Sequence, residues 1–213
     1  MKIGVFDSGI GGEAIAKVLA SEFQQASLTV VNDKANVPYG DRSPREVRSL
    51  TEAAIMPLLG SDVIVIACNT ATSLAIEYLR GNYPDQLFIG IEPMIKPAAA
   101  STKTNTIAVC ATPATLASKR YKKLVQKYGA HLEIIEPDCS AWAYLIENNL
   151  INKSHVEAVI TDVCKRGADQ IVLGCTHYHW IKQLIESVAG QDVAIIEPSQ
   201  AIVGRVKSLL KID

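Results

Sequence analysis

Short apolar runs alternate with helix-like stretches along the whole chain of 213 residues. The runs are rich in β-branched residues, which is typical of strands buried in a sheet. We predict strands at Lys2–Phe6, Leu28–Asn32, Val63–Ala67, Phe88–Gly90, Thr106–Cys110, Leu132–Ile135, Ile171–Leu173 and Ala194–Ile196. We predict helices at Gly12–Phe23, Pro44–Leu59, Pro113–Tyr128, Lys153–Arg166 and Tyr178–Val188. This alternation indicates an α/β fold of mainly parallel sheets flanked by helices.

A weak internal repeat divides the chain into two halves. The stretch Lys2–Gly9 opens the first half, Thr106–Pro113 opens the second half, and a cysteine-ended strand follows later in each. The repeat predicts two pseudo-symmetric lobes, residues 1–93 completed by 198–213, and residues 94–197. In open parallel sheets ligands bind beyond the carboxyl ends of the strands, so we expect the active site in the cleft between the lobes.

Two cysteines, Cys68 and Cys175, end the matching apolar runs of the two halves. Small polar residues and a helix-like stretch follow each of them, so each thiol is expected where a strand meets a helix N-terminus. The partial positive charge at that place favours the thiolate, which acts as a base or a nucleophile. The duplicated unit therefore suggests paired chemistry, with one thiol on each side of a substrate.

The residues that follow each cysteine, Asn69-Thr70 and Thr176-His177, offer an amide, hydroxyls and backbone N–H groups suited to a carboxylate. The glycine-rich stretch Asp7–Gly12 has two interpretations. It is a turn after the first strand, or a dinucleotide loop in which Asp33 would suit a ribose. Its glycines do not fit the G-x-G-x-x-G pattern, and Asp7 would repel a pyrophosphate but suit an ammonium group or a catalytic thiol.

Two further stretches leave alternatives open. Pro38–Ser43 is either an ordinary turn before a helix capped by Ser43, or a loop whose Tyr39 and Gly40 line the cleft. Cys175–His179 contains zinc-type ligands, but no second cluster with zinc spacing accompanies it. We expect no metal and no cofactor, and a zinc hydrolase remains only as an alternative.

The composition of the chain indicates which kinds of binding partner and which cellular compartment to expect. The formal net charge is -1, so no basic excess points to nucleic acid. No apolar run is long enough to span a bilayer, and the N-terminus lacks a signal-peptide pattern. The five cysteines form no C-x-x-C pair, and Cys110 and Cys164 fit buried small hydrophobic residues best. We expect a cytoplasmic protein with a small-molecule partner, and leave a homodimer open.

Several motifs resemble those of the cofactor-independent glutamate racemases of the aspartate/glutamate racemase superfamily. They are Gly4–Gly12, Val37–Gly40, Ala67–Ala71, Glu92-Pro93 with Lys96–Ala98, Ala111–Thr115 and Gly174–Tyr178. They occur in the family's order and spread over nearly the whole chain. The resemblance implies a racemase that interconverts L- and D-glutamate by two-base proton transfer at Cα, without a cofactor. It also implies that the product, D-glutamate, serves peptidoglycan synthesis.

The resemblance also implies roles for individual residues. Cys68 and Cys175 would be the two bases, Asp7 the acid near the first cysteine, and His177 the histidine after the second. The run 139–147 is similar to the family's segment that ends in an acid, here Glu147, which assists the second cysteine. Substrate contacts would fall on Asp7, Ser8, Tyr39, Gly40, Asn69, Thr70, Thr112, Thr115, Thr176 and His177.

The chain departs from the family pattern in three places. It ends at Ile212-Asp213, short of the C-terminal extension that is usual in the family and helps to complete the first lobe. Glu197 stands where the family usually has an aspartate, and His179 replaces a common proline. These departures keep two alternatives open: a racemase for aspartate or another amino acid, and a non-catalytic amino-acid-binding homologue.

Overall fold

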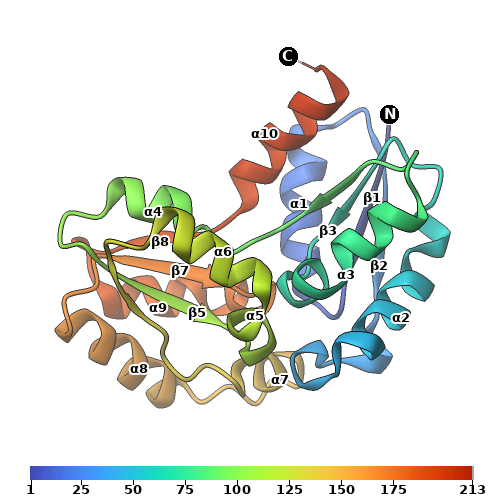
Figure 1. The fold of residues 1–213 in the computed structure, drawn as a ribbon. Helices are drawn as coiled ribbons and strands as arrows, with labels where there is room; N and C mark the ends of the chain where they lie inside the picture. Colours follow the sequence, from blue (N-terminus) through green and yellow to red (C-terminus); the bar gives the residue numbers. More distant parts are fainter. Residues whose placement is uncertain (213) are drawn as a thin grey trace. The chain divides into compact units, whose positions relative to one another are not determined.

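The computed structural model describes residues 1–212, and the chain divides into two compact units. Unit 1 comprises Met1–Glu92 and the C-terminal segment that begins at Pro198, and unit 2 comprises Pro93–Glu197. Each unit contains one parallel four-stranded sheet with helices on both of its faces (Figure 1). The predicted α/β class with two sheet-containing lobes is therefore confirmed.

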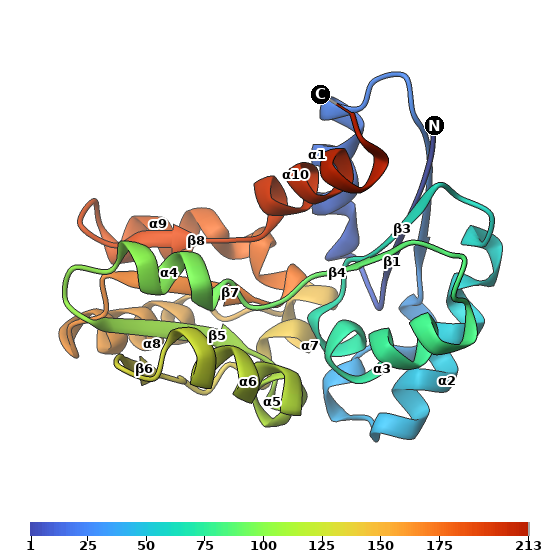
Figure 2. The same ribbon diagram turned by 45° about the horizontal axis from the view of Figure 1, so that its top comes forward.

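Unit 1 has the sheet order β2-β1-β3-β4. Its strands are β1 (Lys2–Asp7), β2 (Ser27–Asn32), β3 (Val63–Ile66) and β4 (Phe88–Gly90). Its helices are α1 (Gly12–Glu22), α2 (Pro44–Ile55), α3 (Asn69–Asn82) and α10 (Ser199–Leu210), with 3-10 segments η1 (Lys34–Asn36), η2 (Tyr39–Asp41) and η3 (Met56–Leu58). Helix α10 lies beside α1 in both ribbon views (Figures 1 and 2).

Alternating side chains of the central strands explain why unit 1 has helices on both faces. Val5 of β1 packs in one cluster with Leu19 of α1 and Val206 of α10. The next residue, Phe6, packs in the opposite cluster with Leu79 of α3. Because successive side chains of a strand point to opposite faces, β1 needs apolar cover on both sides. This accounts for the continuous apolar runs that mark the strands in the sequence.

Unit 2 repeats this arrangement, with the sheet order β6-β5-β7-β8. Its strands are β5 (Thr106–Ala111), β6 (Glu133–Ile135), β7 (Gln170–Gly174) and β8 (Ala194–Ile196). Its helices are α4 (Ile95–Ser101), α5 (Pro113–Ala117), α6 (Lys119–Tyr128), α7 (Trp142–Glu147), α8 (Lys153–Lys165) and α9 (Lys182–Ala189), with the 3-10 segment η4 (Thr176–Ile181). Helices α4 and α6 lie side by side in Figures 1 and 2.

The chain crosses from one unit to the other twice, each time at a Glu-Pro pair. After β4 it passes through Glu92-Pro93 into unit 2, where α4 is the first helix. After β8 it passes through Glu197-Pro198 back into unit 1, where α10 is the last helix. Each unit therefore receives a covering helix from the chain that has just completed the other sheet. This matching topology is the structural basis of the internal repeat.

Three predicted helices differ from the observed ones. The helix predicted over 113–128 is interrupted at Ser118, which has extended backbone and accepts a hydrogen bond from the Tyr121 N–H at 3.1 Å as the cap of α6. The helix predicted from Tyr178 begins as the 3-10 segment η4, and α9 starts only at Lys182. Helix α2 ends before Pro57, whose missing N–H cannot continue it.

In unit 2, Asp169 ties the start of β7 to the turn at residues 102–104. Its carboxylate accepts hydrogen bonds from the Thr102 hydroxyl at 2.6 Å and from the N–H groups of Lys103 and Thr104. Burial raises the pKa of Asp169, but these hydrogen bonds outweigh it, so that the pKa lies below its usual value. The folded protein therefore holds the ionised carboxylate more strongly than the unfolded chain does.

We expect Asp169→Asn to lower the free energy of unfolding by about 1–2 kcal/mol near pH 7, because a charged acceptor is lost. For a depressed pKa the stabilisation is complete above about pH 5 and is lost as the pH falls through the folded-state value. The difference between wild type and variant should therefore shrink near pH 3. Urea unfolding of wild type and Asp169→Asn at pH 7 and pH 3 measures this difference in the free energy of unfolding. An equal difference at the two pH values would contradict a stabilising role of the ionised Asp169 carboxylate.

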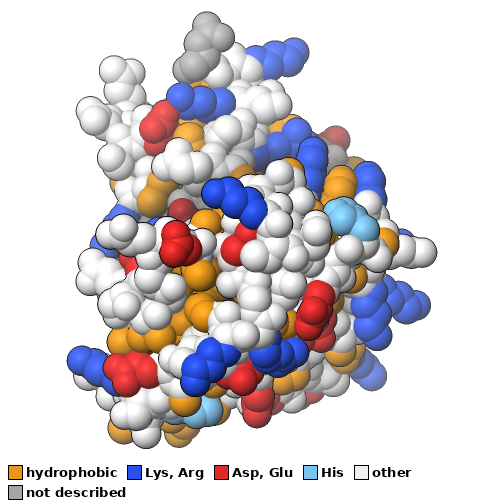
Figure 3. Space-filling view, turned by 90° about the vertical axis from the view of Figure 1, so that its left-hand side faces the viewer, with side chains coloured by type: hydrophobic (Ala, Val, Ile, Leu, Met, Phe, Trp, Pro, Cys, Tyr) orange, Lys and Arg blue, Asp and Glu red, His pale blue; other side chains and the backbone are white. Residues whose placement is uncertain are grey.

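The described part of the surface carries charges of both signs. On the face shown in Figure 3, acidic and basic side chains are interspersed, with hydrophobic side chains exposed between them. Among residues 1–212, no helix is both long enough and apolar enough to cross a membrane.

Candidate active site

The structure divides the predicted site residues between the two units. The first cysteine site, in unit 1, consists of Asp7, Ser8, Tyr39, Gly40, Cys68, Asn69 and Thr70. The second cysteine site, in unit 2, consists of Thr112, Thr115, Glu147, Cys175, Thr176 and His177. All of these residues are buried except Gly40 and Glu147, which are half-buried.

In the first cysteine site, two neighbouring strands bring Asp7 and Cys68 to the same edge of the sheet. Phe6 of β1 is paired with Ile66 of β3, and the Ala67 N–H donates to the Phe6 carbonyl at 2.7 Å. The residues that follow therefore leave the sheet together at its carboxyl-terminal edge. This is the edge at which parallel sheets bind ligands.

Cys68 is the N-cap residue of α3. Its Sγ accepts a hydrogen bond from the Ala71 N–H at 3.4 Å, and the Ser8 hydroxyl lies 3.3 Å from the same sulfur. Hydrogen-bond donors and the positive end of a helix stabilise a thiolate relative to a thiol. The structure thus places this thiol at the helix N-terminus that the sequence predicted, and adds Ser8 as a direct neighbour of the sulfur.

Asp7 is fully buried at the end of β1. Its Oδ1 accepts a hydrogen bond from the Gly9 N–H at 2.8 Å. A side chain at Gly12 would bring its Cβ to 2.4 Å from the Asp7 Cβ, so helix α1 can begin here only with glycine. Close packing against a buried carboxylate therefore explains one of the glycines that a dinucleotide loop would have used for a phosphate.

The loop that carries Tyr39 and Gly40 is packed into unit 1. Tyr39 is 1% exposed and belongs to the same hydrophobic cluster as Cys68. Its hydroxyl donates to Asp33 Oδ2 at 2.7 Å. Burial, followed by this hydrogen bond, raises the pKa of Tyr39 well above its usual value. Ser43 caps α2 with Pro44 at its first position, as one of the two interpretations of this stretch predicted. The structure also places Tyr39 in the cluster of Cys68, and a role of Tyr39 and Gly40 in the site stays a prediction.

Asn69 and Thr70 are the first two residues of α3 and are each 3% exposed. Within the described residues, the Asn69 Oδ1 atom is buried and has no hydrogen-bond partner. An unpaired buried amide oxygen costs free energy unless a donor reaches it. Asn69 therefore offers a free acceptor beside Cys68, suited to a hydrogen-bond donor of a ligand.

The second cysteine site is built on the equivalent strands of unit 2. Ala111 at the end of β5 is paired with Gly174 at the end of β7, so Thr112 and Cys175 leave the sheet at the same edge. Thr112 caps α5, because its Oγ1 accepts from the Thr115 N–H at 3.3 Å and lies 3.0 Å from the Thr115 hydroxyl. The buried hydroxyls of Thr112 and Thr115 therefore lie near the second thiol. In the same way, the amide of Asn69 and the hydroxyl of Thr70 lie near the first thiol.

A buried chain of titratable side chains leads away from Cys175. Its Sγ lies 3.8 Å from His177 Nδ1, and His177 Nε2 lies 2.6 Å from Glu147 Oε2. The His177 and Glu147 side chains are 3% and 8% exposed. We assign the Nε2 proton to the bond with Glu147, because a carboxylate only accepts, and this leaves Nδ1 as an acceptor for the thiol proton.

The two thiols therefore have different surroundings. Cys175 is followed by a 3-10 segment and not by an α-helix, and its side chain makes no capping hydrogen bond. Cys175 stands at the N-terminus of a helical segment, as predicted, but this segment is a 3-10 helix and α9 begins only at Lys182. In this tighter segment His177 lies within reach of the sulfur, so a side-chain base stands where Cys68 has a backbone donor.

The other cysteines show no comparable arrangement. Cys110 and Cys139 are buried and hydrogen-bonded to each other, and this bond, with burial, raises the pKa of Cys139 well above its usual value. Cys164 is half-buried on α8. All five cysteines are free thiols. Within residues 1–212, no group of three or more His, Cys, Asp or Glu side chains could hold a metal ion.

Two of the departures from the family pattern are neighbours in unit 2. His179 Nε2 lies 3.9 Å from Glu197 Oε2, near the point where the chain leaves the unit. Burial lowers the pKa of His179, and the Glu197 charge opposes this effect. The unusual residues at 179 and 197 therefore face each other.

Asn32 was not among the predicted site residues, and Asp33 was considered only as a partner of a nucleotide ribose. Asn32 is paired with Asp7 across β1 and β2, and its Oδ1 is buried without a partner among the described residues. Asp33, the next residue, holds the Tyr39 hydroxyl. Both residues could have been found from their position at the carboxyl end of β2, because ligands bind beyond the carboxyl ends of parallel strands. Asp7 occupies the equivalent position at the end of β1.

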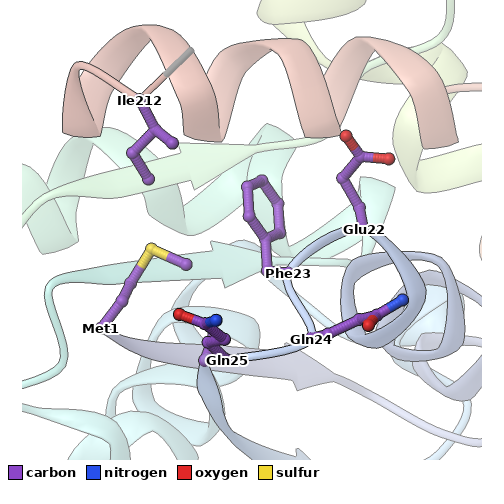
Figure 4. A pocket seen from close by; sticks show the side chains of 7 residues that line it. Met1, Glu22, Phe23, Gln24, Gln25 and Ile212 are labelled. Atoms are coloured by element: carbon purple, nitrogen blue, oxygen red, sulfur yellow. The ribbon is translucent and has the colours of Figure 1, made fainter.

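Two open hollows lie at the opposite edge of the unit 1 sheet. The hollow in Figure 4 has a volume of about 480 Å³ and is lined by Met1, Glu22, Phe23, Gln24, Gln25, Ala26 and Ile212. The other, of about 460 Å³, is lined by residues 59–61 and 82–86. Both lie where strands begin, so neither belongs to the first cysteine site.

Comparison with known proteins gives consistent results. Residues 12–206 match the family described as Asp/Glu/Hydantoin racemase. A glutamate racemase of Herpetosiphon aurantiacus is 39% identical over 214 residues, which cover 98% of this chain and 84% of the relative. The structure of Francisella tularensis glutamate racemase in complex with D-glutamate is 30% identical, with a TM-score of 0.80 over 99% of this chain and 81% of that chain. Escherichia coli glutamate racemase shares the fold, with a TM-score of 0.89 over 99% and 82% of the two chains at 23% identity.

Proposed function

The chain belongs to the Asp/Glu/hydantoin racemase family and is an amino-acid racemase, and we propose that it interconverts L- and D-glutamate by two-base proton transfer at Cα. The observation that carries the proposal is the duplicated thiol. Cys68 follows β3 and Cys175 follows β7, which are the equivalent strands of two sheets with the same topology. Each thiol is accompanied by buried polar groups that suit an amino acid.

Racemisation requires that a proton leave one face of Cα and that another arrive on the opposite face. In the proposed reaction one thiolate removes the proton, the other thiol delivers one, and the roles reverse for the other enantiomer. At Cys68 the Ala71 N–H and the Ser8 hydroxyl stabilise the thiolate before it acts. Asp7, buried at the end of the adjacent strand, provides the carboxylate of this site.

At Cys175 the proton has a defined route. His177 Nδ1 accepts it from the thiol, and the Glu147 carboxylate stabilises the imidazolium that forms. When Cys175 acts as the acid, the same pair returns the proton. The second site therefore prepares its thiolate with a side-chain base, and the first site with hydrogen-bond donors.

Loss of the α-proton leaves a carbanion, which needs stabilisation where no electron-accepting cofactor takes part. We propose that preorganised donors bind the α-carboxylate, onto which the charge spreads. Candidates are the N–H groups at the start of α3 and the buried side chains of Asn69, Thr70, Thr112 and Thr176. We propose that the enzyme uses neither a metal nor an organic cofactor.

D-glutamate is a constituent of peptidoglycan, so we propose that the enzyme supplies it for cell-wall synthesis. The reaction needs both catalytic cysteines as free thiols, and all five cysteines are free in the structure. A reducing compartment keeps thiols in this state, so we place the enzyme in the cytoplasm.

Circular dichroism of L-glutamate solutions tests the substrate without any coupling enzyme. With protein dialysed against a chelator and with no cofactor added, the signal should decay to that of the racemic mixture. L-aspartate and other L-amino acids, run in parallel, test the alternative that the changes at His179 and Glu197 have shifted the substrate. Thermal stabilisation by glutamate without any decay would instead indicate a non-catalytic binding protein.

A further inference from the structure

We propose that Asp33 is a positioning residue of the first cysteine site, which holds Tyr39 and Gly40 in place for the substrate. The proposal deepens the proposed function and rests on it, because Tyr39 and Gly40 are expected substrate contacts. Asp33 follows β2 and lies at the start of the loop that leads to these two residues. It acts through Tyr39 and is not itself assigned to the reacting groups.

Three side-chain hydrogen bonds converge on the Asp33 carboxylate. The Asn36 amide donates to Oδ1 at 2.9 Å and to Oδ2 at 3.1 Å, and the Tyr39 hydroxyl donates to Oδ2 at 2.7 Å. The backbone N–H of Asp33 donates to the Asp7 carbonyl at 3.0 Å. One residue therefore ties both ends of the segment 36–39 to the end of β1.

A second set of bonds closes the far side of the loop. Arg42 Nε donates to the Asn36 carbonyl at 2.8 Å, and the Arg42 N–H donates to the Tyr39 carbonyl at 3.2 Å. The Asn36 N–H donates to the Asp33 carbonyl at 3.1 Å. Every one of these bonds lies within residues 33–42, and the Asp33 carboxylate is the acceptor for the Tyr39 hydroxyl.

The bond to Asp33 fixes what Tyr39 presents to the site. A tyrosine hydroxyl has one proton, and here that proton is donated to a carboxylate. The ring is held beside Phe6, with the ring centres 6.3 Å apart, in the cluster that contains Cys68. The Tyr39 ring is thus held by the hydrogen bond of its hydroxyl and by its packing against Phe6. These two contacts keep the backbone of Tyr39 and Gly40 in one orientation at the site.

Removing the carboxylate should loosen this loop without touching the thiol. Asp33→Ala leaves the Tyr39 hydroxyl and the Asn36 amide without their acceptor, and buried groups without partners favour opening. The substrate would then have to order the loop on binding, which weakens affinity in the ground state and the transition state alike. Such a change raises KM more than it lowers kcat.

A double-mutant cycle tests the coupling between the two side chains. We expect Asp33→Ala and Tyr39→Phe each to raise KM for glutamate about tenfold, with kcat changed less than about threefold. The double variant should resemble either single variant, because both remove the same hydrogen bond. Asp33→Asn retains a carbonyl acceptor and should restore most of the affinity. Asp41→Asn removes an exposed charge from the same loop and serves as the matched control.

Hydrogen exchange of the loop amides without substrate gives a readout that does not depend on activity. The Asn36 and Arg42 N–H groups should exchange about tenfold faster in Asp33→Ala than in wild type, and at the wild-type rate in Asp41→Asn. Unchanged exchange and unchanged KM in Asp33→Ala, or KM effects that multiply in the double variant, would overturn the proposal. A wild-type protein without glutamate turnover would refute the proposed function, and the exchange rates would still test the anchor.

Discussion

Replacing Cys68 with serine is expected to lower kcat for racemisation about 10²- to 10⁴-fold in both directions, and Cys175→Ser should do the same. A serine hydroxyl is a far weaker acid than a thiol, so it supplies almost no base near neutral pH. Each direction of a two-base reaction uses one thiol to remove a proton and the other to deliver one. Loss of either thiol therefore stops both L-to-D and D-to-L conversion.

Cys164→Ser is the matched control for these variants. Cys164 is half-buried on α8 and has no part in the proposed reaction, so its replacement should leave kcat within about twofold of wild type. Circular dichroism from each pure enantiomer measures both directions. If either Cys68→Ser or Cys175→Ser kept a near wild-type rate, the two-thiol mechanism would be wrong.

Replacing His177 with asparagine is expected to have the second-largest effect, a fall in kcat of about 10²- to 10³-fold with little change in KM. His177 lies between the Cys175 sulfur and the Glu147 carboxylate, 3.8 Å from the first and 2.6 Å from the second. Without it the thiol loses the acceptor for its proton. The change acts on the transition state, so the loss appears in kcat.

Glu147→Gln should have a smaller effect of the same kind, about tenfold on kcat. The amide can still accept from His177 Nε2, but it no longer stabilises the imidazolium by its charge. His131→Asn changes an exposed histidine of the same unit and serves as the control. A His177→Asn variant that raised KM and left kcat unchanged would show that His177 binds substrate and does not assist the thiol.

The strands were the most predictable part of the fold. The buried runs Val63–Ile66 and Gln170–Gly174 were recognised to within one residue, because a strand covered on both faces needs a continuous apolar sequence. The short edge strand at Ala194–Ile196 was found from its apolar, β-branched sequence, although it is only partly buried. The carboxyl ends of these strands then indicated where Asp7, Cys68 and Cys175 would lie.

Contacts made by tertiary packing could not be predicted from the spacing of residues, and the role of Glu147 was expected only from the resemblance to the racemase family. Glu147 reaches His177 because α7 is held against η4, where the rings of Trp142 and Tyr178 lie 5.2 Å apart. Nothing in the spacing of residues 147 and 177 reveals this. The bond between Asp33 and Tyr39 likewise depends on how the loop folds back, and local sequence showed only that both follow β2.

The central claim, that two different thiols act on one Cα, is tested most directly by racemisation of L-glutamate in D₂O at early times. A thiol exchanges its proton with solvent, so the acid that delivers to Cα carries deuterium. We predict that the first D-glutamate formed carries deuterium at Cα while the remaining L-glutamate still carries protium, as read by mass spectrometry after separation of the enantiomers. D-glutamate that retained the original protium, or deuterium that appeared equally fast in the remaining L-glutamate, would contradict the account.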